Sequence, residues 1–257
     1  MARQLSADGA QVWLLARDAA RLQAALAQVN AARLAATQHC GALSCDVSDA
    51  QQVSDALRQA TDRVGLPDVL INSAGIATPG YFEKLPLELF RQEMAVNYFG
   101  AVHTCHALAP GMIARGSGQI INMSSAGGFL GVFGYTAYSA SKYALTGFTD
   151  ALRSELKPHG IRTSIVFPPD ADTPMLRREI PLRPPESQAI ADNLHPASAE
   201  DVARKTLREA ARGAYMIFPG GNTLFWYWAV SLLGGLRYSI VDAIIADAQK
   251  KMKKASV

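Results

Sequence analysis

The sequence predicts an α/β fold built on a parallel sheet, and three observations point to it. Short apolar runs alternate along the chain with longer stretches of helical pattern. The apolar runs are continuous rather than alternating, which is typical of strands covered by helices on both faces. The 257 residues, 49% of them hydrophobic, suffice for one large domain with an ample core. Alternating strands and helices imply parallel pairing with right-handed crossovers.

Six strands are predicted, one for each short apolar run. Their lengths of four or five residues are ordinary for strands of a buried sheet. They are Val12–Ala16, Ala42–Asp46, Val69–Asn72, Gln119–Met123, Thr163–Phe167 and Ala214–Phe218.

Five helices are predicted around these strands. Ser48 and Ser198 are N-cap candidates because acids follow early in both helices. The Pro-rich segment Pro181–Ser187 is expected to be a mobile loop within the domain. The helices are Asp18–Ala36, Ser48–Val64, Leu87–Arg115, Thr136–Lys157 and Ser198–Arg212.

The C-terminal part has a different character. Leu224–Leu236 holds thirteen residues without a charge, including two of the three tryptophans. A bilayer span needs about 20 residues, so this run is too short to cross one. It is typical of an interfacial segment, with Trp226 to Trp228 at headgroup level and the lysines that follow on phosphates. A lid over a pocket or a dimer contact is the alternative. We therefore expect a domain over 1–221 and an extension over 222–257 that contacts membrane or lipid.

The composition excludes several classes of function. A net charge of +3 is too small to indicate a nucleic-acid partner. Cys40, Cys45 and Cys105 are odd in number and form no C-x-x-C motif, which favours free thiols in a reducing compartment. We expect a cytoplasmic protein, at the face of a membrane if the extension binds lipid. The histidines form no metal-ligand cluster, and no metal is expected; His103 and His106 fit one helix face.

The stretch "TAYSASKYAL" places Tyr138 and Lys142 four residues apart on one helix face. A phenol titrates near ~10, and a cation beside it favours the phenolate. The pair could therefore donate a proton near neutral pH. The alternative is a surface tyrosine beside a solvated lysine.

Three further motifs occur in a fixed order before this pair. "INSAG" (Ile71–Gly75) follows a strand, "VNYFG" (Val96–Gly100) lies within a helix, and "INMSSAGG" (Ile121–Gly128) ends a strand thirteen residues before Tyr138. In open α/β sheets, ligands bind at the carboxyl ends of strands. The ordered set resembles the short-chain dehydrogenase/reductase family from residue 1 to about 220. The resemblance implies a Rossmann-like, doubly wound parallel sheet.

The resemblance also implies catalytic roles. Tyr138 matches the tyrosine that protonates the alkoxide, and Lys142 matches the lysine that lowers its pKa and holds the nicotinamide ribose. Ser125 matches the serine that hydrogen-bonds the carbonyl oxygen, whereas Ser124 is one residue away from the usual spacing. Asn97 matches the asparagine that holds a water in the proton relay. Ketone reduction needs a proton donor, a hydrogen bond to the developing charge and a hydride, which no side chain supplies.

A nicotinamide cofactor is therefore expected. Ala16 stands where relatives that prefer NAD carry an acid, and Arg17 follows, where it can pair with a 2′-phosphate. This favours NADP(H), unless Arg17 is only a surface charge at the helix entry. The other cofactor-binding residues that the resemblance implies are Asp46, Val47, Asn72, Ala74, Gly75, Pro168 and Thr173.

The substrate prediction comes from "FPPDADTP" (Phe167–Pro174) and "GFLGVFGYTAYSASK" (Gly128–Lys142). Both resemble 3-ketodihydrosphingosine reductases, which implies reduction of a long-chain sphingoid base by a homo-oligomer in sphingolipid metabolism. Asp170 or Asp172 could meet the substrate's 2-amino group, or the two acids could cap the next helix, as we favour for Asp172. The alternatives are another apolar ketone (retinoid, steroid or acyl) and an inactive, membrane-associated remnant.

One family feature is missing. The family begins with a strand and a Thr-Gly-x-x-x-Gly-x-Gly loop, whose amides meet the pyrophosphate. Here "MARQLSADGAQVWLL" begins inside the first helix, and Gly9 is the turn before a strand. We expect Met1 to be an internal methionine of a longer protein, and the activity that the resemblance implies is expected of that complete protein. We also expect no earlier strand to bridge Val12–Ala16 and Val69–Asn72.

Overall fold

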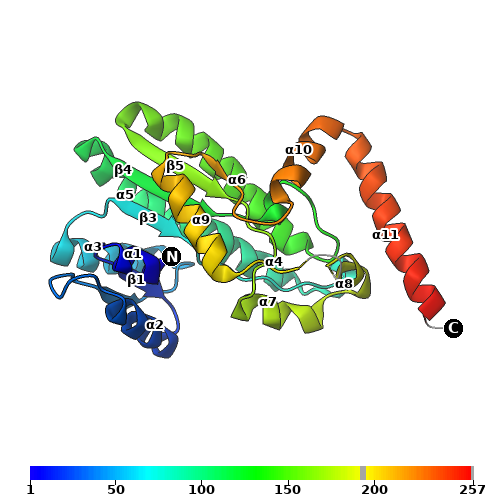
Figure 1. The fold of residues 1–257 in the computed structure, drawn as a ribbon, viewed down its shortest axis with the longest axis horizontal. Coiled ribbons are helices and arrows are strands. Elements are labelled where there is room, and N and C mark those ends of the chain that lie inside the picture. The colour runs from blue at the N-terminus through cyan, green and yellow to red at the C-terminus, as the bar shows by residue number, and fades with distance from the viewer. Residues whose placement is uncertain (192–194, 256–257) are drawn as a thin grey trace.

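The computed structural model describes residues 1–191 and 195–255 (Figure 1). Its strands follow the predicted apolar runs, with ends that differ by up to two residues. They are β1 Trp13–Ala16, β2 Gly41–Ser44, β3 Val69–Asn72, β4 Gly118–Met123, β5 Ile161–Val166 and β6 Met216–Ile217.

Helices connect and flank these strands, as an α/β fold requires. The α-helices are α1 Ala2–Ala7, α2 Ala19–Ala31, α3 Ala50–Val64, α4 Leu87–Met94, α5 Gly100–Arg115, α6 Thr136–Leu156, α7 Pro174–Glu179, α8 Pro185–Ala191, α9 Ala199–Ala211, α10 Thr223–Leu233 and α11 Leu236–Ala255.

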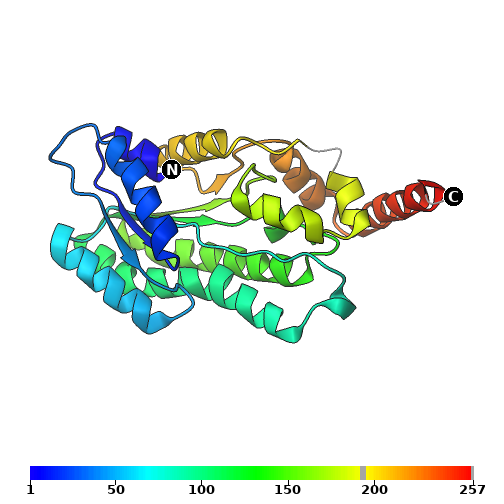
Figure 2. The same ribbon diagram turned by 90° about the horizontal axis from the view of Figure 1, so that it is seen from below.

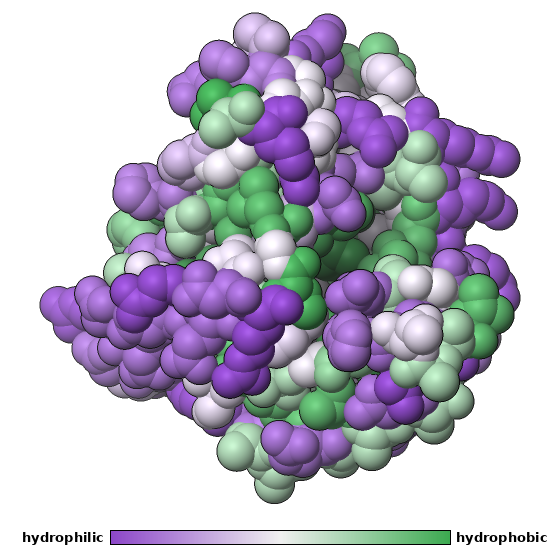
Figure 3. Space-filling view, turned by 90° about the vertical axis from the view of Figure 1, so that its left-hand side faces the viewer, coloured by the Kyte–Doolittle hydropathy of each residue, from purple (hydrophilic) through white to green (hydrophobic). Residues whose placement is uncertain are grey.

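The strands form two parallel sheets, one of β1 and β2 and one in the order β3-β4-β5-β6. Within residues 1–191 and 195–255 no strand pairs with both β1 and β3, so the predicted break between them is confirmed. The exposed edge has a physical signature: Val69 at the start of β3 is 41% exposed, whereas Ile120 in β4 is fully buried. Figure 3 looks onto the end that carries α1 to α3 and shows apolar side chains in a hollow between polar rims.

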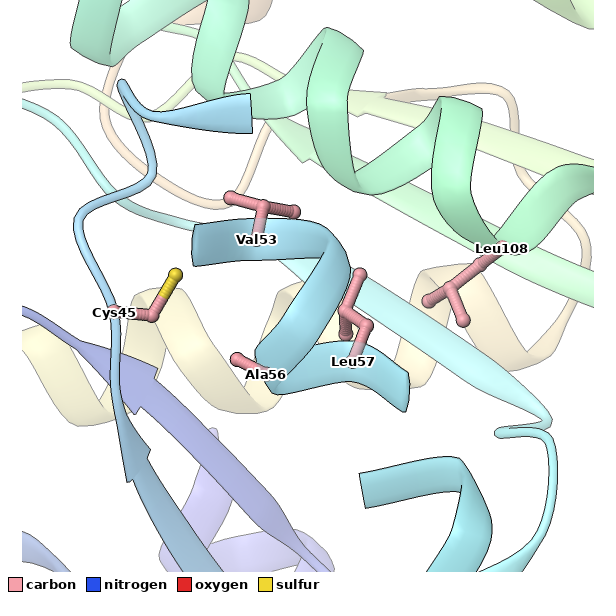
Figure 4. Packing of buried hydrophobic residues seen from close by; sticks show 5 residues of the cluster. All are labelled: Cys45, Val53, Ala56, Leu57 and Leu108. Carbon is pink, nitrogen blue, oxygen red and sulfur yellow. The ribbon is translucent and has the colours of Figure 1, made fainter. Parts of the chain in front are cut away.

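Helices cover both faces of the strands, as the continuous apolar runs predicted. Figure 2 shows α3, α5 and α6 along one face and α2 and α9 along the other. One apolar cluster links the two sheets beneath α3, because Leu43 of β2 and Leu70 of β3 both pack against it. The buried members of this cluster, drawn in Figure 4, are Cys45, Val53, Ala56, Leu57 and Leu108.

Two helix starts test the capping predictions. Ser198 is the N-cap of α9, where its hydroxyl accepts a hydrogen bond from the Asp201 N–H, so this prediction is confirmed. The prediction for Ser48 is wrong, since Asp49 caps α3 and accepts from two backbone N–H groups. The Ser48 hydroxyl instead donates to the Asp46 carboxylate at 2.7 Å. A carboxylate accepts more strongly than a hydroxyl, which explains the shift by one residue.

Two other segments differ from their predictions. The expected helix Leu87–Arg115 is interrupted by a π-helical turn, η2 (Ala95–Phe99), that contains Asn97. Such turns insert one extra residue and often occur at functional sites. The segment Pro181–Ser187 is not an irregular loop, because it contains the end of a 3₁₀ turn (η5, Ile180–Leu182) and the start of α8. Proline is favoured in the first turn of a helix, so these prolines help to start the helices.

The C-terminal extension is a helical hairpin. Gly234, with φ of 50°, lies between α10 and α11. Tyr227 of α10 packs against Phe167 and Phe218, and α11 contacts α8. No helix of the described residues is long and apolar enough to cross a membrane. The side chains of Lys251, Lys253 and Lys254, expected on phosphates, lie outside the described residues.

Candidate active site

Helix α6 places Tyr138 and Lys142 on the face turned towards β4. The Lys142 Nζ lies 5.7 Å from the centre of the Tyr138 ring and donates to the Met123 carbonyl oxygen at 2.9 Å. Lys142 is 4% exposed, whereas Tyr138 is half-buried. The pair therefore lies at the carboxyl end of β4 and is not a surface tyrosine beside a solvated lysine.

Burial controls the electrostatics of this pair. Burial raises the pKa of Tyr138. The hydrogen bond with the Ser125 hydroxyl lowers this pKa, and the negative charges of Glu179, Asp170 and Glu93 raise it further. Burial also lowers the pKa of Lys142 to about 8. The expected lowering of the phenol pKa is thus not seen, because desolvation disfavours both charged forms.

Of the two adjacent serines, Ser125 faces the tyrosine. Its hydroxyl accepts from the Gly127 N–H at 3.1 Å and lies close enough to Tyr138 to lower the phenol pKa. Ser124 is 3% exposed, and its hydroxyl lies 3.1 Å from that of Thr146. Ser125 is therefore the serine that a substrate carbonyl at Tyr138 could reach.

Asn97 fixes the loop after β3. Its Nδ2 donates to the Ile76 carbonyl oxygen at 2.9 Å and to the Ser141 hydroxyl at 2.9 Å, and its Oδ1 accepts from the Ile76 N–H at 2.8 Å. Both N–H donors of the amide and one lone pair of its oxygen are engaged inside the protein, so Asn97 ties the loop to α6. Gly75 of this loop is close enough that a Cβ atom there would lie 3.4 Å from Asn97 Oδ1 and 3.6 Å from Lys142 Nζ.

The residues expected to bind a cofactor lie along the same carboxyl ends, but not all present their side chains. Asn72 donates to Asn122 Oδ1 at 2.8 Å and accepts from the Thr104 hydroxyl at 2.7 Å, so its side chain is engaged inside the sheet. Ala74 is exposed and Gly75 half-buried, which leaves the backbone of this loop accessible. Val47 packs against Gly100, where a Cβ atom would lie 2.8 Å from Val47 Cγ2.

Arg17 and Asp46 face each other across the ends of β1 and β2. Arg17 Nη1 lies 3.3 Å from Asp46 Oδ2, and the Arg17 side chain is 75% exposed. Hydrogen bonds from Ser48 and Arg17 hold the pKa of Asp46 below its usual value. The guanidinium is therefore positioned by an acid and open to a further anion.

The loop after β5 carries the remaining predicted residues. The Pro168 carbonyl oxygen accepts from the Ala126 N–H at 3.2 Å. Thr173 caps α7 by accepting from the Leu176 N–H, so the prediction that Asp172 caps this helix is wrong. Asp172 instead forms an ion pair with Arg177 at 2.9 Å. An arginine within reach gives this carboxylate a stronger partner than a backbone N–H.

A polar chain beside the tyrosine was not predicted from the sequence. Arg183 donates to Asp170 Oδ2 and to the Tyr135 hydroxyl, both at 2.7 Å, and the Tyr135 hydroxyl donates to Glu179 Oε2 at 3.1 Å. The Tyr135 ring meets that of Tyr138 edge to face at 6.0 Å. These contacts fasten the segment after β5 to the start of α6. The sequence feature that could have indicated this chain is Tyr135, which lies one helical turn before Tyr138.

A buried acid on α4 was also missed. Glu93 is 0% exposed, and its Oε1 accepts from the Thr78 N–H at 2.7 Å. Its position four residues before Asn97 was readable in the sequence. Within the described part of the chain, no three His, Cys, Asp or Glu side chains gather as they would around a metal ion.

Comparisons with known proteins agree with this geometry. The 3-ketodihydrosphingosine reductase of Bos taurus is 36% identical over 209 residues, which are 81% of this chain and 63% of that protein. The enzyme of the same name from Dictyostelium discoideum is 39% identical over 178 residues, 68% of this chain and 53% of that protein. The chain thus spans less than two thirds of the length of these relatives.

Solved structures share the fold. Levodione reductase superposes with a TM-score of 0.78 at 24% identity, covering 86% of this chain and 90% of that one. A metagenomic short-chain oxidoreductase in complex with NADP has a TM-score of 0.60 at 33% identity, covering 65% and 74%. Residues 1–181 match the family described as short chain dehydrogenase. This chain belongs to the short-chain dehydrogenase family.

Proposed function

We propose that this protein uses NADPH to reduce the 3-keto group of a long-chain sphingoid base. The observation that carries the proposal is the meeting of Tyr138, Lys142 and Ser125 at the carboxyl end of β4. The name shared by the relatives from Bos taurus, Mus musculus and Dictyostelium discoideum supports this substrate.

The residues present fit the nicotinamide and the 2′-phosphate of a nicotinamide cofactor, whereas the Gly-rich loop that meets the pyrophosphate in the family is missing from this sequence. The loop of Ala74 and Gly75 offers accessible backbone next to Lys142, since a Cβ atom at Gly75 would be in van der Waals contact with Lys142 Nζ at 3.6 Å. Arg17, exposed and oriented by Asp46, offers a cation for a 2′-phosphate. We assign NADP(H) on this arrangement, and the bound cofactor supplies the hydride.

The chain's own residues then handle the proton. Ser125 and Tyr138 donate hydrogen bonds to the substrate's carbonyl oxygen, where negative charge develops. Tyr138 gives its proton to that oxygen, and the Lys142 ammonium stabilises the phenolate that remains. Asn97 holds the loop that carries Gly75 in place. Asp170, already paired with Arg183, is a weaker candidate for the substrate's amino group than its sequence position indicated.

The hairpin of α10 and α11 supports contact with a lipid surface. Phe225, Trp228 and Leu232 on α10 are 65%, 56% and 81% exposed. Exposed tryptophan and leucine on one short helix suit the boundary of headgroups and acyl chains. A long alkyl substrate would enter from such a surface. Replacing these three residues by serine should reduce sedimentation with phosphatidylcholine vesicles; unchanged sedimentation would favour a lid or a dimer contact.

A homo-oligomer through the helices that hold Asn97 and Tyr138 also fits the surface. Phe99, Ile113 and Tyr143 on these helices are 44%, 37% and 44% exposed. Sedimentation velocity of the purified chain should show a species of at least twice the mass of the 27.5 kDa protomer. A single species at the protomer mass would contradict this assignment.

The function is tested by NADPH oxidation in detergent with 3-ketodihydrosphingosine, a retinoid ketone, a steroid ketone and an acyl ketone. We expect the sphingoid ketone to be turned over fastest. The Tyr138→Phe variant should lose several orders of magnitude in kcat while it keeps its affinity for NADPH. A faster rate with another ketone would show that this ketone class, and not the sphingoid base, is the substrate. A fully active Tyr138→Phe variant would show that Tyr138 is not the proton donor.

A further inference from the structure

Glu93 on α4 is a buried carboxyl that the proposed chemistry does not use. It is 0% exposed. The Thr78 N–H satisfies its Oε1 at 2.7 Å, whereas Oε2 has no hydrogen-bond partner among the described residues. Buried polar atoms are nearly always partnered, and an isolated buried carboxylate is costly. A hydrogen bond to the Thr78 N–H alone therefore does not explain why a carboxyl is buried at position 93.

Lys142, on a neighbouring helix, is a cation whose charge favours the ionised form of Glu93. Helix α4 packs against α6, which carries this lysine. The Glu93 carboxyl and the Lys142 ammonium act on each other electrostatically, and each is almost wholly removed from solvent. Asn97, one turn after Glu93, and Lys142 both flank Gly75. Glu93 of α4 and Asn97 of η2 thus both hold the loop from Gly75 to Thr78, and the Gly75 end of this loop lies against Lys142.

The other charges that act on Glu93 and Tyr138 are negative and do not take the place of Lys142. Glu179 of α7 has the same sign as Glu93 and makes its ionisation harder. The negative charges of Glu179, Asp170 and Glu93 all raise the pKa of Tyr138 in α6, so they disfavour the phenolate. Lys142 is the cation that favours ionisation of Glu93. Glu93 in turn is the charge that opposes the effect of burial on Lys142.

We propose that Glu93 is a positioning residue that keeps the buried Lys142 in its charged form beside Tyr138. The inference rests on the role proposed for Lys142 in the reaction. Without the carboxylate, the Met123 carbonyl oxygen would be the one hydrogen-bond partner of the ammonium among residues 1–191 and 195–255. A neutral lysine could still accept a hydrogen bond, but it would stabilise no phenolate.

The test measures Lys142 directly and needs neither cofactor nor turnover. The full chain is labelled with ¹³C at the lysine ε-carbons, and the Lys142 signal is assigned with Lys142→Met. In the wild type its midpoint should lie at about 8. Glu93→Gln keeps an acceptor for the Thr78 N–H but removes the charge, and it should lower the midpoint by about one pH unit or more. Glu88→Gln on the exposed side of α4 is the matched control and should leave it unchanged.

A Lys142 midpoint in Glu93→Gln that coincides with the wild-type value would overturn the inference. If that variant fails to fold by circular dichroism, the wild type alone decides. Its Lys142 signal should then show a second, smaller inflection near pH 7, where Glu93 ionises, and a single smooth step would overturn the inference. If the Lys142 midpoint shifts in Glu93→Gln but the protein reduces no ketone, the effect of Glu93 on Lys142 is confirmed and only the proposed function is wrong.

Discussion

The buried carboxyl of Glu93 should make the stability of the protein depend on pH. Burial raises its pKa from the ordinary value of 4.5 to about 7. The folded state therefore holds this proton more tightly than the unfolded chain does. The stabilisation is complete below the unfolded pKa and is lost as pH rises through the folded pKa. Glu93→Gln cannot titrate and should lack this dependence.

The size of the effect follows from the shift. Each pKa unit corresponds to 1.36 kcal/mol, so a rise from 4.5 to about 7 gives at most about 3 kcal/mol. Between pH about 4.5 and about 7, the free energy of unfolding of the wild type should fall by this amount relative to Glu93→Gln. Glu179, whose pKa burial also raises, is present in both proteins and cancels in the difference.

The assay is urea denaturation followed by tryptophan fluorescence across this pH range. The slope of the transition should be equal in the two proteins, so the midpoints report stability. Glu88→Gln, which changes an exposed acid paired with Arg91, should run parallel to the wild type. If the wild type and Glu93→Gln also run parallel, the carboxyl is not held protonated by burial, and the reasoning fails.

Three further predictions follow from other contacts. Arg17→Ala should weaken binding of NADPH at least about tenfold more than that of NADH in fluorescence titrations, since one charge-assisted contact is worth about 1.4 kcal/mol or more; equal weakening would make Arg17 structural. Arg183→Met should lower the free energy of unfolding by about 2 kcal/mol, between the values for exposed and buried pairs, because Asp170 is 41% exposed; unchanged urea midpoints would contradict this. Ser198→Ala should cost about 1 kcal/mol by the same assay through loss of the α9 cap, and no loss would show that water replaces it.

The fold could be predicted because buried parallel strands leave a continuous apolar signature. Val69–Asn72 has identical bounds in sequence and structure, since Pro67 and Asp68 precede it and small residues follow it. Tyr138 and Lys142 could be paired because helical spacing alone places them on one face. The break between β1 and β3 could be predicted because no apolar run precedes Val12.

The helix caps, the π-helical turn and the pKa of Tyr138 were not predicted correctly, because they depend on which neighbouring groups lie closest in the folded structure. Asp49 displaces Ser48 as a cap, and Thr173 caps where Asp172 was expected because Arg177 takes the acid. The π-helical turn at Asn97 has no sequence periodicity of its own. The pKa of Tyr138 depends on how deeply the ring is buried, and burial reverses the direction that the adjacent lysine alone would give.

The proposed reduction is tested most directly by following the hydride. The purified full chain is incubated with NADPH that carries two deuterium atoms at C4 of the nicotinamide and with 3-ketodihydrosphingosine in detergent. If Tyr138, Lys142 and Ser125 perform the reaction, mass spectrometry should show one deuterium at C3 of the alcohol product, and Tyr138→Phe should yield almost none. A product without deuterium, or equal labelling with Tyr138→Phe, would contradict it.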